Sequence, residues 1–318
     1  MSDKQESVEV SVVSPMYNEE LTVTEFVTRT YAALEKMQTT FELIIVNDGS
    51  KDKTESILRK LSETYANLKI VCLARNSGQW AATYAGLQES IGDYVVIIDG
   101  DLQQRPEEIH LLVEKNKEGF SLVSGFRQKR KESYFLRLLP SKIANYVLRK
   151  ITNCPAKDLG GFKCIEGNMA RALRLRAGQH RLLPALVWLR GGQVAEIPVS
   201  SDPRFAGESH YGLSRSFDVL FDIALLWMRN SFKARQIYLF GHISLLICLI
   251  SCSLFAWILY EKIIFGVAMA NRPPFFISLS GIFIAMGFMS FGFVLEIISD
   301  IQSTVSERKP YYIREVIK

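Results

Sequence analysis

Hydrophobic and polar residues alternate along the first 125 residues in two kinds of block. Short apolar runs rich in valine and isoleucine predict strands, and longer stretches with apolar residues three or four apart predict helices. The predicted strands are residues 8–14, 41–47, 68–73, 94–98 and 120–125. The predicted helices between them are residues 19–37, about 52–65, about 78–90 and near 106–117. This alternation predicts an α/β domain with a mostly parallel sheet and helices on both faces.

A short polar segment follows each of the first four predicted strands. These segments are PMYNE at 15–19, NDGSKD at 47–52, ARNSGQ at 74–79 and DGDLQ at 99–103. Because the carboxyl ends of parallel strands meet at one edge of a sheet, we expect the four segments to line one crevice. No G-x-G-x-x-G follows the first strand, so a dinucleotide-binding dehydrogenase is poorly supported.

The fourth predicted strand ends in two carboxylates, Asp99 and Asp101. Two acidic groups so close repel each other unless a cation lies between them. Together with Gln103 they make an all-oxygen ligand set suited to Mg²⁺ or Mn²⁺. A solvated acidic turn is the alternative, and for an isolated D-x-D it would be the better explanation. The buried strand before the pair and the polar loops around it favour the cation site.

Composition changes sharply in the last third of the chain. Residues 237–259 contain His242 as their one ionisable side chain, and residues 275–295 contain no charge. Each run is long enough to cross the roughly 30 Å hydrocarbon core of a membrane as a helix. A buried hairpin in a soluble core is the alternative, but two such runs with a short linker favour a transmembrane hairpin at about 237–259 and 275–298.

Charge placement predicts the orientation of this hairpin. The net charge of +5 is modest, but basic residues gather on the outer flanks of the two runs. They are Arg229, Lys233, Arg235, Arg308, Lys309, Arg314 and Lys318. The positive-inside rule then predicts that the large domain and both termini are cytoplasmic. The polar first ten residues predict no secretory signal, and the five cysteines show neither metal-ligand nor disulfide spacing.

Two further segments have apolar stripes typical of amphipathic helices. Residues 216–236 place apolar side chains at helical spacing and end in basic residues, and residues 134–152 interleave apolar and basic side chains. Either helix could lie at a membrane surface or face the core of the globular domain. The predicted organisation is a catalytic domain at 1–213, a juxtamembrane helix at 214–236 and an anchor with a cytoplasmic tail at 237–318.

Seven motifs in a fixed order carry a family resemblance. They are PMYNEE, VNDGSKDKT, LARNSGQWAAT, IDGDLQQRPE, SGFR, DLGGFK and RFAGES, followed by the paired apolar runs. In this order they resemble family 2 glycosyltransferases with a GT-A fold, and especially the polyprenyl-phosphate glycosyltransferases, such as bactoprenol glucosyltransferases and dolichyl-phosphate mannose synthases. The resemblance covers nearly the whole chain.

The resemblance implies roles for the loop residues in donor binding. Asp48 would accept a hydrogen bond from the nucleotide base, although an Asx-turn role is the structural alternative. Gly78 would border the sugar nucleotide or simply begin a helix. The metal, held by Asp99, Asp101 and Gln103, would offset charge on the departing diphosphate. The implied nucleotide-sugar contacts are Pro15, Tyr17, Asn18, Glu19, Asp48, Ser50, Arg75, Gln79, Asp99 and Gly100.

The resemblance also implies an acceptor site with cationic groups. A polyprenyl phosphate presents an oxygen that is already ionised, so it needs positioning against the negative donor more than a strong base. The implied catalytic residues are Asp158, Arg127, Arg204, Arg137 and Ser209. Asp158 would be a base or orient the phosphate, with a helix or turn cap as the alternative, and the arginines could instead form a solvated basic face. Where many relatives have lysine after the serine of G-E-S, this chain has His210.

The predicted function is therefore inverting, metal-dependent transfer of a hexose from a nucleotide sugar to a polyprenyl phosphate at the cytoplasmic face of the plasma (inner) membrane. UDP-glucose is the first choice of donor, on resemblance alone. A homo-oligomer is left open, and no nucleic acid partner is expected. Three rivals are a GDP-mannose-dependent synthase, a processive polysaccharide synthase and a non-catalytic scaffold. The processive enzyme should carry a Q-x-x-R-W segment, which is absent from the sequence.

Overall fold

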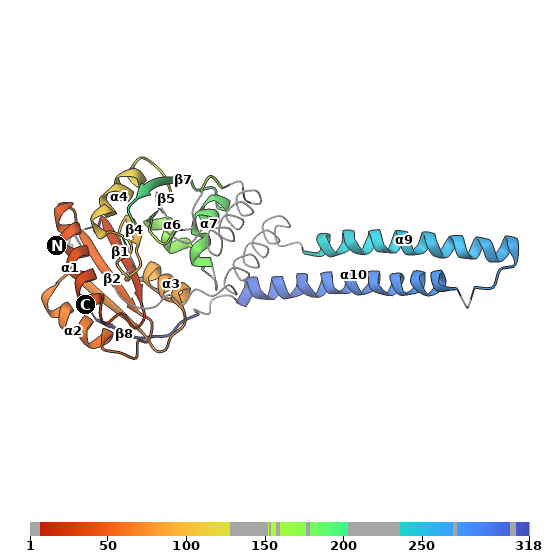
Figure 1. The fold of residues 1–318 in the computed structure, drawn as a ribbon, viewed down its shortest axis with the longest axis horizontal. Helices are drawn as coiled ribbons and strands as arrows, with labels where there is room; N and C mark the ends of the chain where they lie inside the picture. Colours follow the sequence, from red (N-terminus) through yellow and green to blue (C-terminus); the bar gives the residue numbers. More distant parts are fainter. Residues whose placement is uncertain are drawn as a thin grey trace. The chain divides into compact units, whose positions relative to one another are not determined.

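The computed structural model describes residues 7–127, 152, 154–156, 160–175, 179–202, 236–269, 272–305 and 310–317. The chain divides into two compact units. The first combines Met1–Ile223 with Lys309–Lys318, and the second is Ala224–Arg308. Figure 1 shows both units in colours that follow the sequence. The sheet lies in the first unit, and the two long helices lie in the second.

The first unit is built on a mixed, mostly parallel sheet. Its order across the described residues is β7-β5-β6-β4-β1-β2-β3-β8. Parallel pairing joins β4, β1, β2 and β3 in the centre, and β5 to β7, whereas β6 and β8 run antiparallel to their neighbours. The strands are β1 (Val10–Met16), β2 (Phe41–Asn47), β3 (Leu68–Leu73), β4 (Tyr94–Ile97), β5 (Leu122–Arg127), β6 (Lys163–Glu166), β7 (Val194–Val199) and β8 (Ile313–Ile317).

Helices cover both faces of this sheet because its central strands are apolar on both sides. Val12 of β1 belongs to the core that also contains Phe26 of α1 and Leu112 of α4. Its neighbour Val13 points to the opposite face, where α3 packs so closely that a Cβ on Gly86 would lie 2.2 Å from the Val13 side chain. The helices are α1 (Val23–Lys36), α2 (Thr54–Thr64), α3 (Gln79–Glu89), α4 (Ile109–Lys117), α6 (Gly167–Ala172) and α7 (Leu183–Leu189), with 3-10 turns at η1 (Pro106–Glu108) and η3 (Gln179–Leu182).

The predicted fold class is confirmed, and its details are extended. The five predicted strands are present, with ends that shift by at most two residues. The helix predicted near 106–117 divides into η1 and α4. The strands β6, β7 and β8 were not predicted. The antiparallel pairings of the sheet are made by β6 and β8. The amphipathic helices predicted at 134–152 and 216–236 lie almost entirely outside the described residues.

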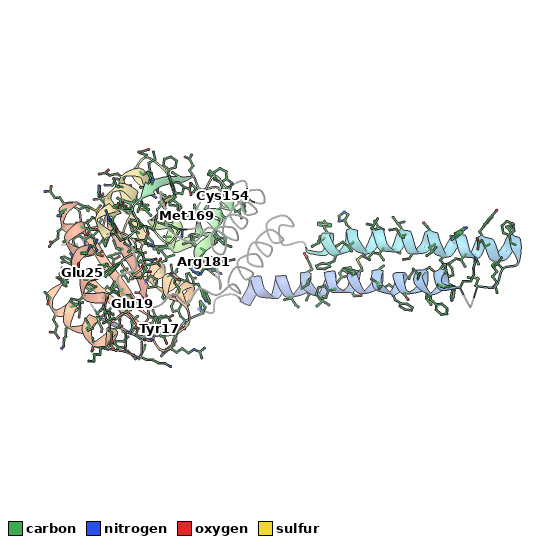
Figure 2. The ribbon with its side chains drawn as sticks, viewed as in Figure 1. Tyr17, Glu19, Glu25, Cys154, Met169 and Arg181 are labelled. Atoms are coloured by element: carbon green, nitrogen blue, oxygen red, sulfur yellow. The ribbon has the colours of Figure 1, made fainter. Side chains whose placement is uncertain are left out.

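The second unit is a helical hairpin of α9 (Gln236–Phe265) and α10 (Pro273–Val305). Its apolar windows, Tyr238–Phe265 and Pro273–Ile298, have mean hydropathies of 2.3 and 2.1. At 1.5 Å per residue each window is about 40 Å long, enough to cross a membrane. Only 17% and 11% of these windows are buried, and Figure 2 shows side chains projecting along both helices. This exposure fits lipid contact better than the core of a soluble protein.

The two helices of the hairpin pack through small and aromatic side chains. The Ser244 hydroxyl donates to the Ala285 carbonyl oxygen at 2.6 Å. The Phe240 ring lies 5.2 Å from the Phe291 ring, edge to face. A Cβ on Gly281 would meet the Ser251 hydroxyl at 2.0 Å, so the glycine permits the close approach of the helices.

The chain after the hairpin returns to the first unit. β8 pairs antiparallel with β3 and forms the edge of the sheet. Tyr311, just before it, is buried and its ring lies 5.8 Å from that of Tyr84 on α3. The Ala74 backbone N–H donates to the Tyr312 carbonyl oxygen at 3.0 Å. In sequence terms, the hairpin is therefore an insertion between the sheet and the sheet's own edge strand.

Candidate active site

The loops after β1 and β2 are bonded to each other at the carboxyl edge of the sheet. The Asn18 backbone N–H donates to Ser50 Oγ at 3.0 Å, and the Lys51 N–H donates to Asn18 Oδ1 at 2.8 Å. The Glu19 N–H donates to Thr54 Oγ1 at 2.9 Å. Asn18 has a positive φ of 55°, a conformation that asparagine tolerates better than most residues. Tyr17 and Glu19 of this first loop are labelled in Figure 2.

Asp48 joins the second loop to the third. Its carboxylate accepts the Ser77 N–H at 2.7 Å and the Gly78 N–H at 2.9 Å. Burial raises the pKa of Asp48 above its ordinary value, and the two backbone hydrogen bonds oppose this rise. In the same loop, Asn47 Oδ1 accepts the Ser50 N–H, three residues on, at 3.0 Å. The Asp48 side chain connects the second loop to the third.

Two glycines permit this close approach of the loops. Gly49 has a φ of +66°, and a Cβ there would lie 2.6 Å from the Arg75 carbonyl carbon. Gly78 has a φ of +90° and precedes α3 as its N-cap residue. Gly78 thus stands at the start of a helix, as its structural alternative predicted, and its backbone N–H also donates to Asp48.

Asp99 is held by two glutamine side chains. Gln79 Nε2 donates to Asp99 Oδ1 at 2.8 Å, and Gln104 Nε2 donates to Asp99 Oδ2 at 3.0 Å. Gln104 is buried, and its Oε1 accepts the Asp99 backbone N–H at 3.2 Å. The sequence prediction missed Gln104, although the doubled glutamine of DLQQ was a visible signal. Both carboxylate oxygens of Asp99 thus face amide donors.

Asp101 begins a tight turn two residues further on. Its Oδ1 accepts the Gln103 N–H at 3.2 Å, and the intervening Leu102 has a φ of +57°. The side chains of Asp99, Asp101 and Gln103 present carboxylate and amide oxygens, which suit a hard divalent cation. Within the described ranges, no group of three or more His, Cys, Asp or Glu side chains could hold a metal by itself. Mg²⁺ commonly takes one or two carboxylates plus waters and substrate phosphates, so the donor set fits such an ion.

A buried lysine lies on the strand beside the one that leads into this acid pair. Lys163 of β6 is opposite Ile97 of β4 in the antiparallel register and is 2% exposed. Its Nζ donates to the Gly160 carbonyl oxygen. The adjoining Gly161 backbone lies directly against the Asp99 carboxylate, because a Cβ on it would lie 2.3 Å from Asp99 Oδ2. Lys163 was not among the predicted site residues, although it ends the DLGGFK motif.

The predicted donor residues gather at this edge, whereas the acceptor residues cannot be placed there. Residues 15–19, 48–50, 75–79 and 99–103 are all described and follow the carboxyl ends of β1 to β4. Arg127 ends β5, and its side chain is outside the described part. Asp158, Arg137, Arg204, Ser209 and His210 also lie outside the described residues, so their roles stay predictions.

Comparisons with known proteins agree with this arrangement. The family model "Glycosyl transferase family 2" matches residues 11–171. A dodecaprenyl-phosphate galacturonate synthase of Rhizobium johnstonii is 31% identical, over 99% of this chain and 95% of its own length. An undecaprenyl-phosphate 4-deoxy-4-formamido-L-arabinose transferase of Edwardsiella ictaluri is 30% identical, over 100% and 97%.

Solved structures share the fold at lower identity. The glucosyl-3-phosphoglycerate synthase of Mycobacterium tuberculosis in complex with Mn²⁺, UDP-glucose and phosphoglyceric acid has a TM-score of 0.54 at 21% identity, covering 70% of this chain and 79% of that one. The mannosyl-3-phosphoglycerate synthase of Rubrobacter xylanophilus has a TM-score of 0.59 at 16% identity, covering 71% and 75%. These matches confirm the GT-A fold of the first unit.

Proposed function

The chain belongs to glycosyltransferase family 2, and we propose that it transfers a hexose from a nucleotide sugar to a polyprenyl phosphate. One observation carries the proposal: the polar loops at the carboxyl edge of the sheet, with Asp99 held by Gln79 and Gln104, lie in a chain that aligns end to end with two transferases named for polyprenyl-phosphate acceptors. Both alignments cover almost the whole chain and therefore include the hairpin.

In this proposal the first three loops bind the nucleotide. Asp48 is the acceptor for a base N–H, and Tyr17 and Ser50 lie in the loops that Asn18 bonds together. Arg75 and Gln79 approach from the third loop, with Gln79 already on Asp99. Loops that are already bonded to one another spend little of the binding energy on becoming ordered. Uracil is the base that we propose, and UDP-glucose is the first donor to test.

The acid pair orients the diphosphate end of the donor. We assign Asp101 and Gln103 as the main ligands of a divalent cation, with Asp99 as a further ligand or as a contact to ribose and sugar, because both Asp99 oxygens already accept amide hydrogen atoms. Such a cation supplies electrostatic stabilisation of the departing nucleoside diphosphate. Gln79 and Gln104 keep the Asp99 carboxylate in one orientation while the donor is bound.

The acceptor side needs positive charge rather than a strong base. A phosphate oxygen of the lipid attacks the anomeric carbon from the side opposite the leaving diphosphate, so the product has inverted configuration. We assign Arg127, Arg137 and Arg204 to positioning of that phosphate. We assign Asp158 and Ser209 to its orientation. The cationic groups offset the repulsion between two anionic substrates.

The hairpin anchors the enzyme where its acceptor resides. The segments before Ala224 and after Arg308 both belong to the first unit, and β8 lies in the same sheet as β1. A two-span hairpin with both ends in one unit enters and leaves the membrane on one side. By the positive-inside rule, the flanking basic residues support a cytoplasmic location for that side. We therefore propose a multi-pass protein of the plasma (inner) membrane with a cytoplasmic catalytic unit.

The test is a transfer assay with purified protein, undecaprenyl phosphate and Mg²⁺ or Mn²⁺. Radiolabelled UDP-glucose, UDP-galacturonic acid and GDP-mannose are supplied separately, and the lipid phase is extracted and counted. We expect labelled lipid with a uridine nucleotide sugar. Product with GDP-mannose alone would make the mannose synthase the better description. Absence of lipid product from every donor, with folded protein, would refute the proposed function.

A further inference from the structure

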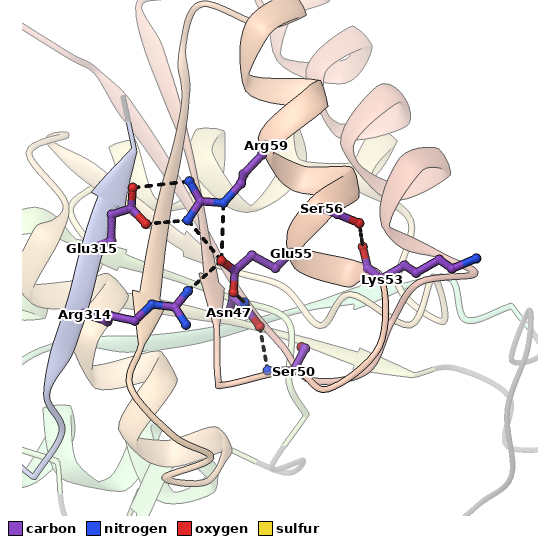
Figure 3. A network of polar contacts seen from close by, with 8 residues as sticks. All are labelled: Asn47, Ser50, Lys53, Glu55, Ser56, Arg59, Arg314 and Glu315. Atoms are coloured by element: carbon purple, nitrogen blue, oxygen red, sulfur yellow. Dashed lines mark hydrogen bonds and ion pairs between the residues drawn. The ribbon is translucent and has the colours of Figure 1, made fainter.

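Four charged residues near the C-terminal strand form a cluster on Glu55, at the start of α2 (Figure 3). Glu55 Oε1 accepts from Arg314 Nη2 at 2.6 Å and from Arg59 Nη2 at 3.0 Å. Arg59 Nη1 also donates to Glu315 Oε1 at 3.2 Å. We call Glu55, Arg59, Arg314 and Glu315 the tail cluster. Two of its members come from β8, which follows the hairpin in the chain.

The tail cluster continues into the nucleotide loops through Asn47. Glu55 Oε2 accepts from Asn47 Nδ2 at 3.2 Å. Asn47 is fully buried, and its Oδ1 accepts the Ser50 N–H at 3.0 Å. Ser50 Oγ in turn accepts the Asn18 N–H at 3.0 Å. A continuous path of hydrogen bonds therefore leads from β8 to the two loops that the proposed function assigns to the nucleotide.

The chemistry of the asparagine explains why Glu55 matters on this path. A carboxamide has a donor end and an acceptor end, and exchanging them would turn Asn47 Nδ2 toward the Ser50 N–H. An ionised carboxylate only accepts, so Glu55 fixes the donor end on its own side. The Arg314 hydrogen bond, with a smaller effect from Arg59, lowers the pKa of Glu55 and keeps it ionised at neutral pH.

We propose that Glu55 and Arg314 are positioning residues for the nucleotide, through which β8 holds the 47–50 loop in its binding shape. This inference rests on the proposed function, because it assigns the cluster to the donor site. The Arg314 and Glu55 side chains are 48% and 25% exposed. Ion pairs this exposed contribute little to folding stability, so their loss should act on the loop rather than on the whole unit.

Four variants of the full chain test the inference. Arg314→Met removes the direct contact between β8 and Glu55, and Glu55→Ala removes the acceptor for Asn47 together with the group that both arginines contact. Glu55→Gln keeps an oxygen that can accept from Asn47 Nδ2. Lys117→Met is the matched control, because the Lys117–Glu9 ion pair has side chains 45% and 34% exposed and its residues belong to none of the nucleotide loops. Each variant is measured for UDP affinity by calorimetry with Mn²⁺, for donor and acceptor KM, for kcat and for thermal midpoint.

We expect Arg314→Met and Glu55→Ala to weaken UDP binding and raise the donor KM by about five- to tenfold, as for a lost contact of about 1 kcal/mol or slightly more. Glu55→Gln should lose at most about threefold, and Lys117→Met less than twofold. The acceptor KM and kcat should stay near those of the wild type, and the thermal midpoint at neutral pH should fall by no more than about 4 °C, as for the loss of an exposed ion pair.

The controls separate failure of this inference from failure of the proposed function. Asp48→Ala is measured beside them and should weaken UDP binding whatever the tail cluster does. If Asp48→Ala weakens UDP binding while Arg314→Met and Glu55→Ala match Lys117→Met, the inference is wrong and the donor site stands. If the wild type binds neither UDP nor GDP, the proposed function fails first. A fall in kcat and a rise in the acceptor KM as large as the rise in the donor KM would show a general structural role and would also overturn the inference.

Discussion

Replacement of Gly161 by alanine should disable the acid pair without altering any residue that carries its chemistry. The added Cβ would lie 2.3 Å from Asp99 Oδ2 and 2.7 Å from Gln104 Nε2, whereas ordinary contact begins at 3.4 Å. Gly161 is not among the glycines with positive φ, so alanine suits its backbone. The strain therefore falls on the Asp99 carboxylate and its hydrogen bond with Gln104.

The size of the effect follows from the displacement. The Asp99 oxygen must move by roughly 1 Å to restore ordinary contact, and a misplacement of this size can cost about 100-fold in rate. We expect kcat/KM to fall by about that factor, equivalent to about 2.7 kcal/mol in activation free energy. Overpacking by one methyl group costs about 1–3 kcal/mol, so the thermal midpoint should fall by about 2–12 °C.

The assay compares kcat/KM for lipid-linked product with the thermal midpoint in the same detergent. Gly287→Ala is the control, because a Cβ at this position in α10 would have no neighbour within 4 Å. It should leave kcat/KM within about twofold of the wild type. A Gly161→Ala enzyme that folds normally and keeps kcat/KM within threefold would refute the reasoning. It would show that transfer tolerates a displaced Asp99.

Three further predictions concern the metal, pH and the nucleotide loops. Asp101→Ala should lower the rate of transfer at least about 100-fold. EDTA should abolish transfer by the wild type until Mn²⁺ or Mg²⁺ is restored. Unchanged transfer in the variant or after EDTA would contradict the ligand assignment. The pKa of Glu55 lies below 4.5 in the folded chain, mainly through Arg314, so folded Glu55 binds fewer protons than unfolded Glu55. Its stabilisation should be complete above pH 4.5 and disappear as the pH falls below, which thermal scans of wild type and Glu55→Gln from pH 7 to pH 3 would show as converging midpoints. Gly49→Ala should lower the thermal midpoint and weaken UDP binding. Alanine at this position would have to adopt a φ of +66°, and its Cβ would lie 2.6 Å from the Arg75 backbone. A midpoint equal to that of the wild type would show that the two loops separate easily.

Local pattern was sufficient for the central architecture. The apolar runs of β1 to β4 are buried on both faces. Such runs can be recognised as strands from their own residues, without reference to distant parts of the chain. Parallel connection then brings the segments after them to one edge, which is why the donor residues could be named in advance. The hairpin was equally visible, because uninterrupted apolar length is a local property.

Contacts between distant segments were decided by tertiary structure. Gln79 and Gln104 donate to Asp99, and the Gly161 backbone lies against the same carboxylate. The spacing of these residues in the sequence does not predict that they meet. β6 and β8 are short strands whose partners are chosen by the free edges available to them, not by their own sequence pattern.

The link between Arg314 and Glu55 spans 259 residues, with both helices of the hairpin between them. A single ion pair leaves no periodic signal in the sequence, because each partner is an ordinary surface charge until the fold places the other beside it. The sequence by itself determined the sheet, its polar edge and the apolar hairpin. Only the closing of β8 onto β3 decided that the end of the chain reaches the nucleotide loops, since edge pairing depends on which backbone donors and acceptors remain exposed after the central sheet has formed.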